Sequence, residues 1–401
     1  MEHLTKADVY NYVNGICFKT GPPGRVGAET EWLIVDPARP RAPVPLERLT
    51  ALVDDAGPLP AGSTVTYEPG GQLELSSLPC QGPAAVATAL SADLEHITAC
   101  LNDAGLRLHG NGLDPYRSPE RQLTLPRYAV MERYFDSASP TGRTMMCSTA
   151  SLQVCLDIGA DTADAARRWR LAHRLGPLFV AAFANSPLWR GRPTGWSSTR
   201  WAVWSAIDAS RTRAPTCDDP DGPAADWLRY ALRARLMTIR RDTAPWIVDP
   251  GLRFGDWLVN GHPQRPTIDD FAYHLTTLFP PVRPRGWLEL RMIDALPQQW
   301  CSVPIAVAAA LIDDPVAADI AYAETERLCS GGVPGRDVWL AAARHALAVP
   351  TIAESTRACF AAAAAALPRL GAADLVAAVD DYRARFVEQG RCPADEQLGD
   401  L

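Results

Sequence analysis

The chain has 401 residues, of which 47% are hydrophobic and 21% charged, enough for one large domain or two ordinary ones with a substantial core. Its net charge of −7 argues against a nucleic-acid-binding protein, because phosphate binding needs a strongly basic face. The N-terminal stretch MEHLTKADVYNYVNG has no apolar core flanked by basic residues, and the apolar runs are too short to span a bilayer, so we expect a cytoplasmic protein.

Short helices and strands are predicted for the first half of the chain, from the spacing of apolar residues and from turn residues. A loop rich in glycine and proline, Gly21-Pro-Pro-Gly24, precedes the first strand. In chain order, we expect a helix over residues 5–14, a strand over 26–35, a strand, turn and strand over 64–77, a helix over 83–104, a strand over 106–110, a strand over 145–158 and a helix over 161–184.

The second half is predicted to contain one further strand and to be helical towards its end. Residues 211–226 are rich in turn residues and indicate a surface loop, whereas 287–293 form the last predicted strand. Strands and helices that do not alternate regularly indicate an α+β fold. We expect a core over residues 1–303 and an alanine-rich helical region over 304–401 packed on it, unless the two form one continuous domain.

The ten cysteines are scattered along the chain without a C-x-x-C pair. This distribution fits reduced, mostly buried thiols better than a disulfide framework or a zinc site. We therefore expect structural roles for the cysteines, including Cys147 and Cys155, which share one face of a predicted strand.

Each of four predicted strands has one apolar and one polar face, because side chains alternate along a strand. The apolar faces carry mainly aliphatic side chains. The polar faces carry Glu29 and Glu31 on the first strand, Gln72, Glu74 and Ser76 on the second, Thr149, Ser151 and Gln153 on the third, and Glu289 and Arg291 on the last.

These polar faces would form one concave acidic surface if the strands belong to a single sheet. Ionised carboxylates close together in a partly desolvated site cost several kcal/mol unless cations compensate them or some are protonated. Oxygen ligands with few histidines point to magnesium or manganese rather than zinc. For any one glutamate, a solvated strand face is the simpler alternative. The predicted metal-binding acids are Glu29, Glu31, Glu68, Glu74 and Glu289.

Glu68 and Glu74 flank the turn signal Pro69-Gly70-Gly71. Because strand parity cannot be carried across a turn, the facing of Glu68 does not follow from that of Glu74. Glycine supplies the positive φ that such a turn needs. The sequence has no G-x-x-x-x-G-K-[ST] motif, so we expect any nucleotide to be held without a P-loop.

Several segments between Gly27 and Pro297 carry a combined pattern that is more specific than any single motif. They include GAETEWLIVD from Gly27, TYEPGGQLELSS from Thr66, TGRTMMCSTASLQVCLD from Thr141 and HLTTLFPPVRPRGWLELRMIDALP from His274. With these segments the chain resembles the glutamate–cysteine ligases of the plant and proteobacterial type, a branch of the glutamine-synthetase-like carboxylate–amine ligases. It is most similar to actinobacterial members whose product, γ-glutamylcysteine, feeds ergothioneine synthesis.

The resemblance implies a curved, mainly antiparallel sheet with a concave active-site face, helices packed outside it and a helical C-terminal part. It also implies that ATP phosphorylates the side-chain carboxylate of L-glutamate, and that the amine of L-cysteine attacks the resulting acyl phosphate. Mg²⁺, or Mn²⁺, and arginine would stabilise charge on the transferring phosphoryl group. The expected partners are these three small molecules, with no nucleic acid, membrane or obligate protein partner.

The resemblance further implies roles for individual side chains. Arg291 is the best candidate for contacting the phosphates, and Arg283 could reach phosphate or the α-carboxylate of glutamate. Guanidinium pairs bidentately with carboxylate, although a surface ion pair is the alternative for each arginine. The expected catalytic residues are Arg291, Arg283 and Glu74, the cofactor-binding residues Arg291, Gln153 and Thr149, and the substrate-binding residues Arg200, Arg211 and Arg283.

Alternatives remain for several of these residues and for the activity. Gln153 is either a metal or substrate contact or a hydrogen-bonded core amide, and we expect structural roles for His274, Trp201 and Trp204 rather than a general base or nucleotide-stacking residues. The alternative functions are a γ-glutamyl ligase with a different amine acceptor and a non-catalytic relative that binds glutamate or nucleotide.

Overall fold

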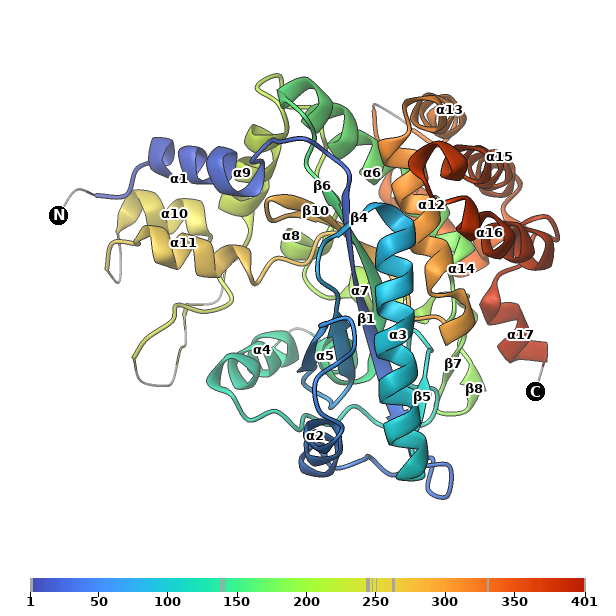
Figure 1. Cartoon of the computed structure of the whole chain (residues 1–401). Helices are drawn as coiled ribbons and strands as arrows, with labels where there is room; N and C mark the ends of the chain where they lie inside the picture. Colours follow the sequence, from blue (N-terminus) through green and yellow to red (C-terminus); the bar gives the residue numbers. More distant parts are fainter. Residues whose placement is uncertain are drawn as a thin grey trace.

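An eight-stranded sheet lies at the centre of the protein (Figure 1). The computed structural model describes residues 3–137, 139, 141–242, 246, 248–249, 251–261, 264–329 and 332–399, and within them every pairing of this sheet is antiparallel. Six strands follow one another across the sheet in the order β2 (Thr64–Tyr67), β3 (Leu73–Ser76), β1 (Arg25–Val35), β6 (Ser151–Asp157), β10 (Trp287–Asp294) and β9 (Val282–Pro284), while β4 (Cys80–Gln81) and β5 (Arg107–His109) also pair with β1.

Strand register gathers the predicted polar side chains. Glu31 on β1 lies opposite Glu74 on β3, and Glu29 lies opposite Gln153 on β6. Because residues directly opposite each other share a face, these side chains occupy one side of the sheet. The predicted faces of the strands and the predicted α+β, mainly antiparallel fold are confirmed.

Three long helices cover the apolar side of the sheet. Helix α3 (Gly82–Asp103) packs on β1, α6 (Thr162–Ala182) on β10 and α12 (Ser302–Asp313) on β6. Asp161 caps α6 by accepting a hydrogen bond from the Asp164 amide, as expected for a helix that begins near residue 161. Strand residues Val26, Leu75, Val154 and Leu290 are fully buried beneath these helices.

Shorter helices surround the polar side of the sheet. In Figure 1 one group lies at the left of the view and a second group lies below the centre. The first group is α1 (Lys6–Tyr12), the π-helical turn η1 (Val13–Cys17), α9 (Pro223–Arg233), α10 (Phe254–Asn260) and α11 (Ile268–Leu275). The second contains α2 (Leu46–Asp55), α4 (Pro126–Asp136) and α5 (Thr141–Ser148), and α7 (Thr199–Ala206) and α8 (Ala209–Thr212) follow the small hairpin of β7 (Leu188–Trp189) and β8 (Arg192–Pro193).

The C-terminal part is helical, as predicted, and lies at the right of Figure 1. Its side chains belong to the same hydrophobic cluster as those of the strands. It contains the turn η2 (Gln298–Trp300), then α12, α13 (Pro315–Glu326), α14 (Arg336–His345), η3 (Ala346–Ala348), α15 (Pro350–Ala366), η4 (Leu367–Leu370), η5 (Ala373–Leu375), α16 (Val376–Tyr382), η6 (Arg383–Val387) and α17 (Pro393–Gly399).

No single helix in the described ranges is long and apolar enough to cross a membrane. One pair of consecutive segments, Gln298–Asp313 and Pro315–Glu326, reaches the required length and composition only when counted together across a bend of 94°.

Two predicted elements differ from the structure. The expected strand over 145–158 is too long, because residues up to Ser148 belong to α5 and only Ser151–Asp157 form β6. Cys147 and Cys155 therefore do not share a strand face. The expected surface loop over 211–226 is wrong at both ends, because the side chain of Arg211 lies fully buried in α8 and residues 223–226 belong to α9.

Candidate active site

A cavity of about 910 Å³ lies between the polar side of the sheet and the surrounding helices. Its size fits a binding site for small molecules. Acids from β1 and β3 line one part, and arginines from α7, β9 and β10 line another. Among the predicted residues, the cavity is lined by Glu29, Glu31, Glu68, Glu74, Thr149, Gln153, Arg200, Arg283 and Arg291.

The hairpin between β2 and β3 brings Glu68 to the acidic part. The amide of Gly71 donates to the carbonyl of Glu68 at 2.8 Å, and Gly71 has a φ of 87°. This is a three-residue turn that ends in a left-handed residue, which glycine adopts without strain. Gly70 lies against the backbone of Cys147, so closely that a Cβ there would stand 2.1 Å from the Cys147 carbonyl oxygen. Glu68 therefore faces the same cavity as Glu74, which strand parity could not establish.

Glu31, Glu68 and Glu74 form a compact acidic cluster. One carboxylate oxygen from each lies within 4.8 Å of the others. Burial raises the pKa of Glu31, and the charge of Glu74 raises it further. Burial likewise holds the pKa of Glu68 well above its usual range, together with the charges of Glu31 and Glu74. In this cluster, the negative charge of the carboxylates must therefore be neutralised by a proton or a cation.

Glu29 borders this cluster on β1. Burial raises the pKa of Glu29 to about 7, with further contributions from the negative charges of Glu289 and Glu74. In the described part of the chain, no donor forms a hydrogen bond to the Glu29 carboxylate.

Glu289 shares the polar side of the sheet but is surrounded by arginines. Its side chain is fully buried, and its oxygens lie 2.6 Å from Arg283, 3.1 Å from Arg291 and 3.7 Å from Arg285. Although burial raises the pKa of Glu289, Arg283 and Arg291 outweigh burial and hold it at about 2. Its oxygens are therefore engaged by arginines, and the expected grouping of Glu289 with the other acids as a metal ligand is not what the geometry shows.

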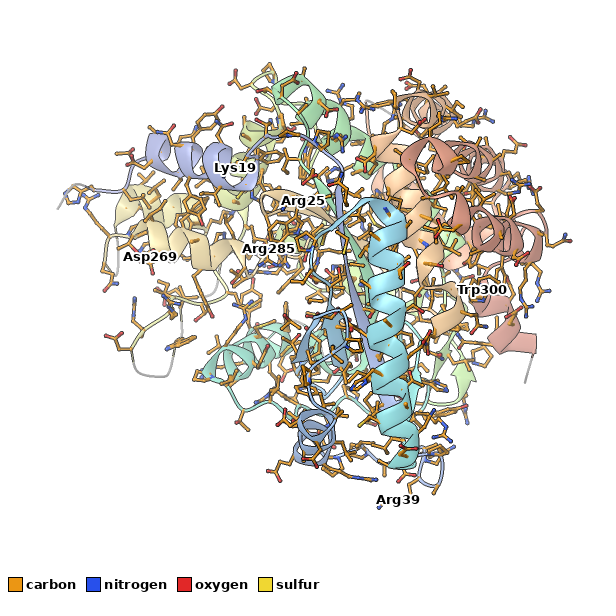
Figure 2. The ribbon with its side chains drawn as sticks, viewed as in Figure 1. Lys19, Arg25, Arg39, Asp269, Arg285 and Trp300 are labelled. Carbon is orange, nitrogen blue, oxygen red and sulfur yellow. The ribbon has the colours of Figure 1, made fainter. Side chains whose placement is uncertain are left out.

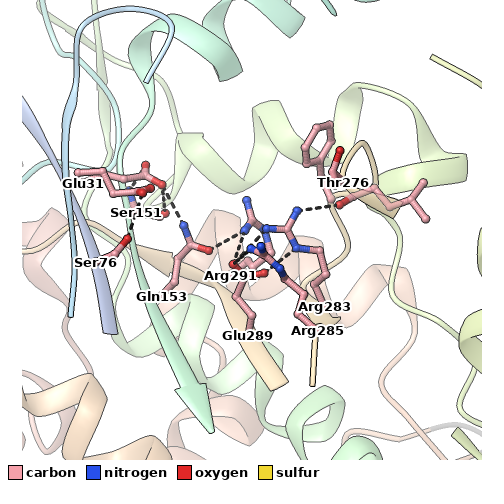
Figure 3. Close-up of polar contacts among 12 residues, drawn as sticks. Glu31, Ser76, Ser151, Gln153, Thr276, Arg283, Arg285, Glu289 and Arg291 are labelled. Atoms are coloured by element: carbon pink, nitrogen blue, oxygen red, sulfur yellow. Dashed lines mark hydrogen bonds and ion pairs between the residues drawn. The ribbon is translucent and has the colours of Figure 1, made fainter. Parts of the chain in front are cut away.

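Gln153 links the acidic cluster to the arginines, and Figure 3 shows the resulting line of contacts. Its Nε2 donates to Glu31 at 3.1 Å, and its Oε1 accepts from Arg291 Nη1 at 2.6 Å. Ser151 donates to Glu31 through both its amide and its hydroxyl, each at 2.8 Å. Gln153 is thus a buried amide with both ends engaged, positioned between the two charged groups.

A β-bulge sets the position of Arg291. The pairing of β10 with β6 shifts between Leu290 and Ile293, so that two residues of β10 face Gln153. Bulges of this kind redirect side chains and often lie beside active sites. The Arg291 amide bonds to the Pro281 carbonyl at 2.8 Å, outside the β6 pairing.

Arg200 reaches the cavity from α7 and is 2% exposed. Its Nη2 donates to the backbone carbonyl of Arg291 at 2.8 Å, and its guanidinium lies over the ring of Trp204. Its Nε and Nη1 have no hydrogen-bond partner among the described residues. Arg200 thus lines the cavity with a guanidinium, a group that pairs with anionic ligands, although Nε and Nη1 are themselves buried.

Arg211 does not line the cavity, contrary to the expectation that it recognises substrate. Its guanidinium is fully buried and bonds to Asp208, Tyr134, and the backbone carbonyls of Thr277 and Arg235. Every nitrogen of the side chain is engaged within the protein. Arg211 therefore holds α8 against its neighbours.

The preferred structural assignments agree with the geometry. His274 is buried, contacts the Ala231 carbonyl at 2.9 Å and has its pKa lowered to about 3 by burial. Trp201 stacks on Trp339 in the core, whereas Trp204 is buried and also lines the cavity. Thr149, which was expected to bind the cofactor, lines the cavity, but its hydroxyl donates to the Met145 carbonyl at 2.5 Å.

Several cavity residues were missed by the sequence analysis. Arg285 lies near the sheet and Asp269 on α11, among the helices at the left (Figure 2). Arg127 reaches across from α4 and donates to Thr276 twice, at 2.8 Å each. Arg285 lies within the segment from His274 that carries the family resemblance, and Arg127 lies within PRYAVMERYF from Pro126, a further segment of that resemblance, which was the available signal.

Cys17 also lines the cavity, from the turn η1. It is 4% exposed, and burial raises the pKa of its thiol to about 12. The remaining cysteines are free thiols as well, as expected.

Comparisons with known proteins agree with this site. The chain is 40% identical over 396 residues to the glutamate–cysteine ligase EgtA of Mycobacterium tuberculosis, covering 96% of this chain and 88% of that protein. It is 30% identical over 337 residues to the chloroplastic glutamate–cysteine ligase of Medicago truncatula, covering 78% of this chain and 66% of that protein.

A solved structure shares the fold. The glutamate–cysteine ligase of Francisella tularensis, crystallised in complex with AMP, superposes with a TM-score of 0.54 at 10% identity, covering 95% of this chain and 85% of that one. The family described as glutamate–cysteine ligase family 2 matches residues 25–399. The chain therefore belongs to glutamate–cysteine ligase family 2.

Proposed function

We propose that this protein is an ATP- and Mg²⁺-dependent ligase that joins the γ-carboxylate of L-glutamate to the amine of L-cysteine. The product is γ-glutamylcysteine, which we assign to ergothioneine biosynthesis. The observation that carries the proposal is a single cavity in which Gln153 joins an acidic cluster to an arginine cluster. Family membership and the relatives named EgtA support the choice of substrates.

The acidic cluster fits a magnesium ion by its donor set. Glu31, Glu68 and Glu74 offer three carboxylate oxygens within 4.8 Å, and oxygen ligands are those that Mg²⁺ and Mn²⁺ prefer. The pKa values of Glu31 and Glu68 are raised because burial and the neighbouring carboxylates outweigh the nearby arginines. A bound ion would neutralise phosphate charge during phosphoryl transfer. We propose these three glutamates as ligands, with Glu29 beside them.

The arginine cluster is suited to the phosphates of ATP. Arg283 and Arg291 line the cavity and are held in place by the buried carboxylate of Glu289. Donors fixed before the reaction stabilise charge on the transferring phosphoryl group without reorganisation. We therefore propose Arg283 and Arg291 as catalytic residues and Glu289 as the residue that positions them.

The unpaired donors of Arg200 are assigned to a carboxylate of L-glutamate. The ammonium of the acceptor must lose a proton before it attacks the acyl phosphate. Glu29 is our candidate for receiving that proton, because it lines the cavity beside the acidic cluster and its carboxylate accepts no hydrogen bond in the described part of the chain.

The test is product formation by the purified protein. With ATP, Mg²⁺, L-glutamate and L-cysteine together, we expect γ-glutamylcysteine by mass spectrometry and phosphate release that requires both amino acids. A panel of other amines tests the alternative acceptor. ATP binding by calorimetry without turnover of any amine would contradict the proposal and favour a non-catalytic relative.

A further inference from the structure

Arg200 depends for its position on the first turn of α7, where it is the second residue. The Arg200 amide donates to the Ser186 hydroxyl at 3.0 Å, and the Trp201 amide donates to the Ser198 hydroxyl at 3.1 Å. Ser198 is the N-cap of the helix, so both serines satisfy amides that a helix leaves unpaired at its start.

Both serine hydroxyls donate to one buried carboxylate, that of Asp294. Asp294 is the last residue of β10 and is 2% exposed. It accepts from Ser186 at 2.7 Å, from Ser198 at 2.9 Å and from the Asn185 amide at 2.9 Å. Through these hydrogen bonds, the Asp294 carboxylate connects the start of α7 to β10, the strand that carries Arg291.

The same carboxylate forms an ion pair with the guanidinium of Arg200 but does not accept a hydrogen bond from it. The shortest distance from Arg200 Nη1 to Asp294 is 3.7 Å, too long for a hydrogen bond. The carboxylate thus compensates the arginine charge, while Nε and Nη1 are buried and form no hydrogen bond with the described residues, and the Arg200 side chain lines the cavity.

The C-terminal helix α17 completes this arrangement. Gln397 donates to the backbone carbonyl of Asn185 at 3.2 Å and to its side-chain oxygen, and accepts from Asn111 at 3.1 Å. The Ala394 amide also bonds to the Ala184 carbonyl at 3.0 Å. A helix at the far end of the chain therefore holds the residue next to Ser186.

We propose that Asp294 is a positioning residue that orients the guanidinium of Arg200 towards a carboxylate of the substrate. We further propose that Gln397, on the C-terminal helix, stabilises this orientation through Asn185. The proposal rests on the function proposed above, because it assigns Arg200 to glutamate. It gives the C-terminal region a role in substrate recognition as well as in packing.

The first test is Asp294→Asn, which keeps the shape of the side chain but replaces one acceptor oxygen with a donor. We expect kcat/KM for L-glutamate to fall about 10- to 100-fold, because small displacements of a positioned group cost that much. We expect KM for ATP to change less than about twofold, since the arginines that we assign to phosphate are held by Glu289.

A cycle with Arg200→Lys separates positioning from general stability. If Asp294 acts through Arg200, Asp294→Asn added to Arg200→Lys should cause little further loss in kcat/KM for glutamate. Equal losses in both backgrounds would overturn the proposal, as would an unchanged kcat/KM for glutamate in Asp294→Asn.

The C-terminal link is tested with Gln397→Ala, which also serves if Asp294→Asn fails to fold. We expect KM for glutamate to rise about three- to tenfold. Glu396→Gln is the matched control on the same helix, because the Glu396 side chain pairs with Arg385 and, among the described residues, forms no hydrogen bond with this network. Gln397→Ala with control-like kinetics would remove Gln397 from the proposal. Absence of product from the wild-type protein would instead contradict the proposed function itself.

Discussion

At the scale of single residues, the distribution of charge in the cavity separates two kinds of glutamate. Glu289 pairs with Arg283, Arg285 and Arg291, whereas among the described residues neither Glu31 nor Glu68 forms an ion pair, although Glu31 accepts hydrogen bonds from Ser151 and Gln153. Unpaired buried carboxylates oppose folding unless they are protonated or bind a cation. The charge of the acidic cluster must therefore be balanced by bound protons or by a cation.

Glu74→Gln tests whether the acidic cluster serves activity rather than stability. The amide keeps an oxygen that can accept from Thr66, which donates to Glu74 at 2.7 Å. We expect turnover to fall at least about 100-fold, with the free energy of unfolding unchanged or raised by about 1 kcal/mol, because one of three crowded charges is removed. Steady-state kinetics and urea unfolding measure the two effects.

The control for this substitution is Glu95→Gln. Glu95 is exposed on α3 and accepts from Ser91 at 3.1 Å, so it has the same chemistry away from the cavity. A Glu74→Gln protein that loses stability while its folded fraction stays active would show that Glu74 is structural.

Metal should stabilise the protein more at higher pH. Burial raises the pKa of Glu68 and that of Glu29, the latter to about 7, so without metal these groups favour the folded state at low pH and oppose it as pH rises through their folded pKa values. Excess MgCl₂ should therefore raise Tm by a few degrees at about pH 7.5 and by less at about pH 5.5. The increment should shrink in Glu68→Gln, and equal increments at both pH values would contradict this account.

At the scale of elements, the turn between β2 and β3 decides whether the acidic cluster forms. Pro69, Gly70 and Gly71 reverse the chain so that Glu68 and Glu74 reach the same cavity. Gly70 can lie against the backbone of Cys147 only because it has no side chain. The position of Glu68 thus depends on contact between this hairpin and α5.

Gly70→Ala should separate the hairpin from α5. The added Cβ would stand 2.1 Å from the Cys147 carbonyl oxygen, which is backbone and cannot move freely. We expect a loss of at least about 2 kcal/mol in unfolding free energy and a larger fall in activity than stability alone explains, because Glu68 shifts. Gly21→Ala is the matched control, since a Cβ there meets no atom within 4 Å.

Strand periodicity predicted much of the candidate site and failed where the backbone is not a regular strand. Glu29, Glu31, Glu74 and Gln153 lie on the predicted face, because β1, β3 and β6 are regular there. The expected strand over 145–158 failed at its start, since a short apolar run such as that before Ser148 fits a buried helix equally well.

Residue type alone could not distinguish the roles of the charged side chains. Arg200 and Arg211 look alike in the sequence, yet the first has unpaired donors at the cavity and the second is fully engaged elsewhere. Asp294 stands at a strand end, where an aspartate ordinarily indicates a turn. Its three hydrogen bonds come from Asn185, Ser186 and Ser198, about a hundred residues away, and local patterns carry no such information.

At the scale of the whole molecule, the boundary predicted between residues 303 and 304 falls within α12. Ten consecutive residues of this helix, Val303–Ile312, are buried. Tyr382 donates to the Ala182 carbonyl at 2.8 Å, which connects α16 to the end of α6. These contacts support our proposal that the two regions form one continuous domain.

Truncation tests this proposal. We expect residues 1–303 expressed alone to be insoluble or to lack cooperative thermal unfolding. Without α12, the apolar surfaces of β6 and α3 that it covers become exposed to solvent. Circular dichroism and gel filtration provide the measurement. A soluble fragment with a sharp unfolding transition would instead support two separate domains.

The thiol of Cys17 has a consequence for a site that handles cysteine. Thiol–disulfide exchange proceeds through the thiolate, and a pKa raised to about 12 leaves on the order of one molecule in 10⁵ in that form at neutral pH. The Cys17 thiol would therefore react slowly with cystine formed by oxidation of the substrate. Cys17 is thus a poor partner for mixed-disulfide formation with a disulfide that enters the cavity.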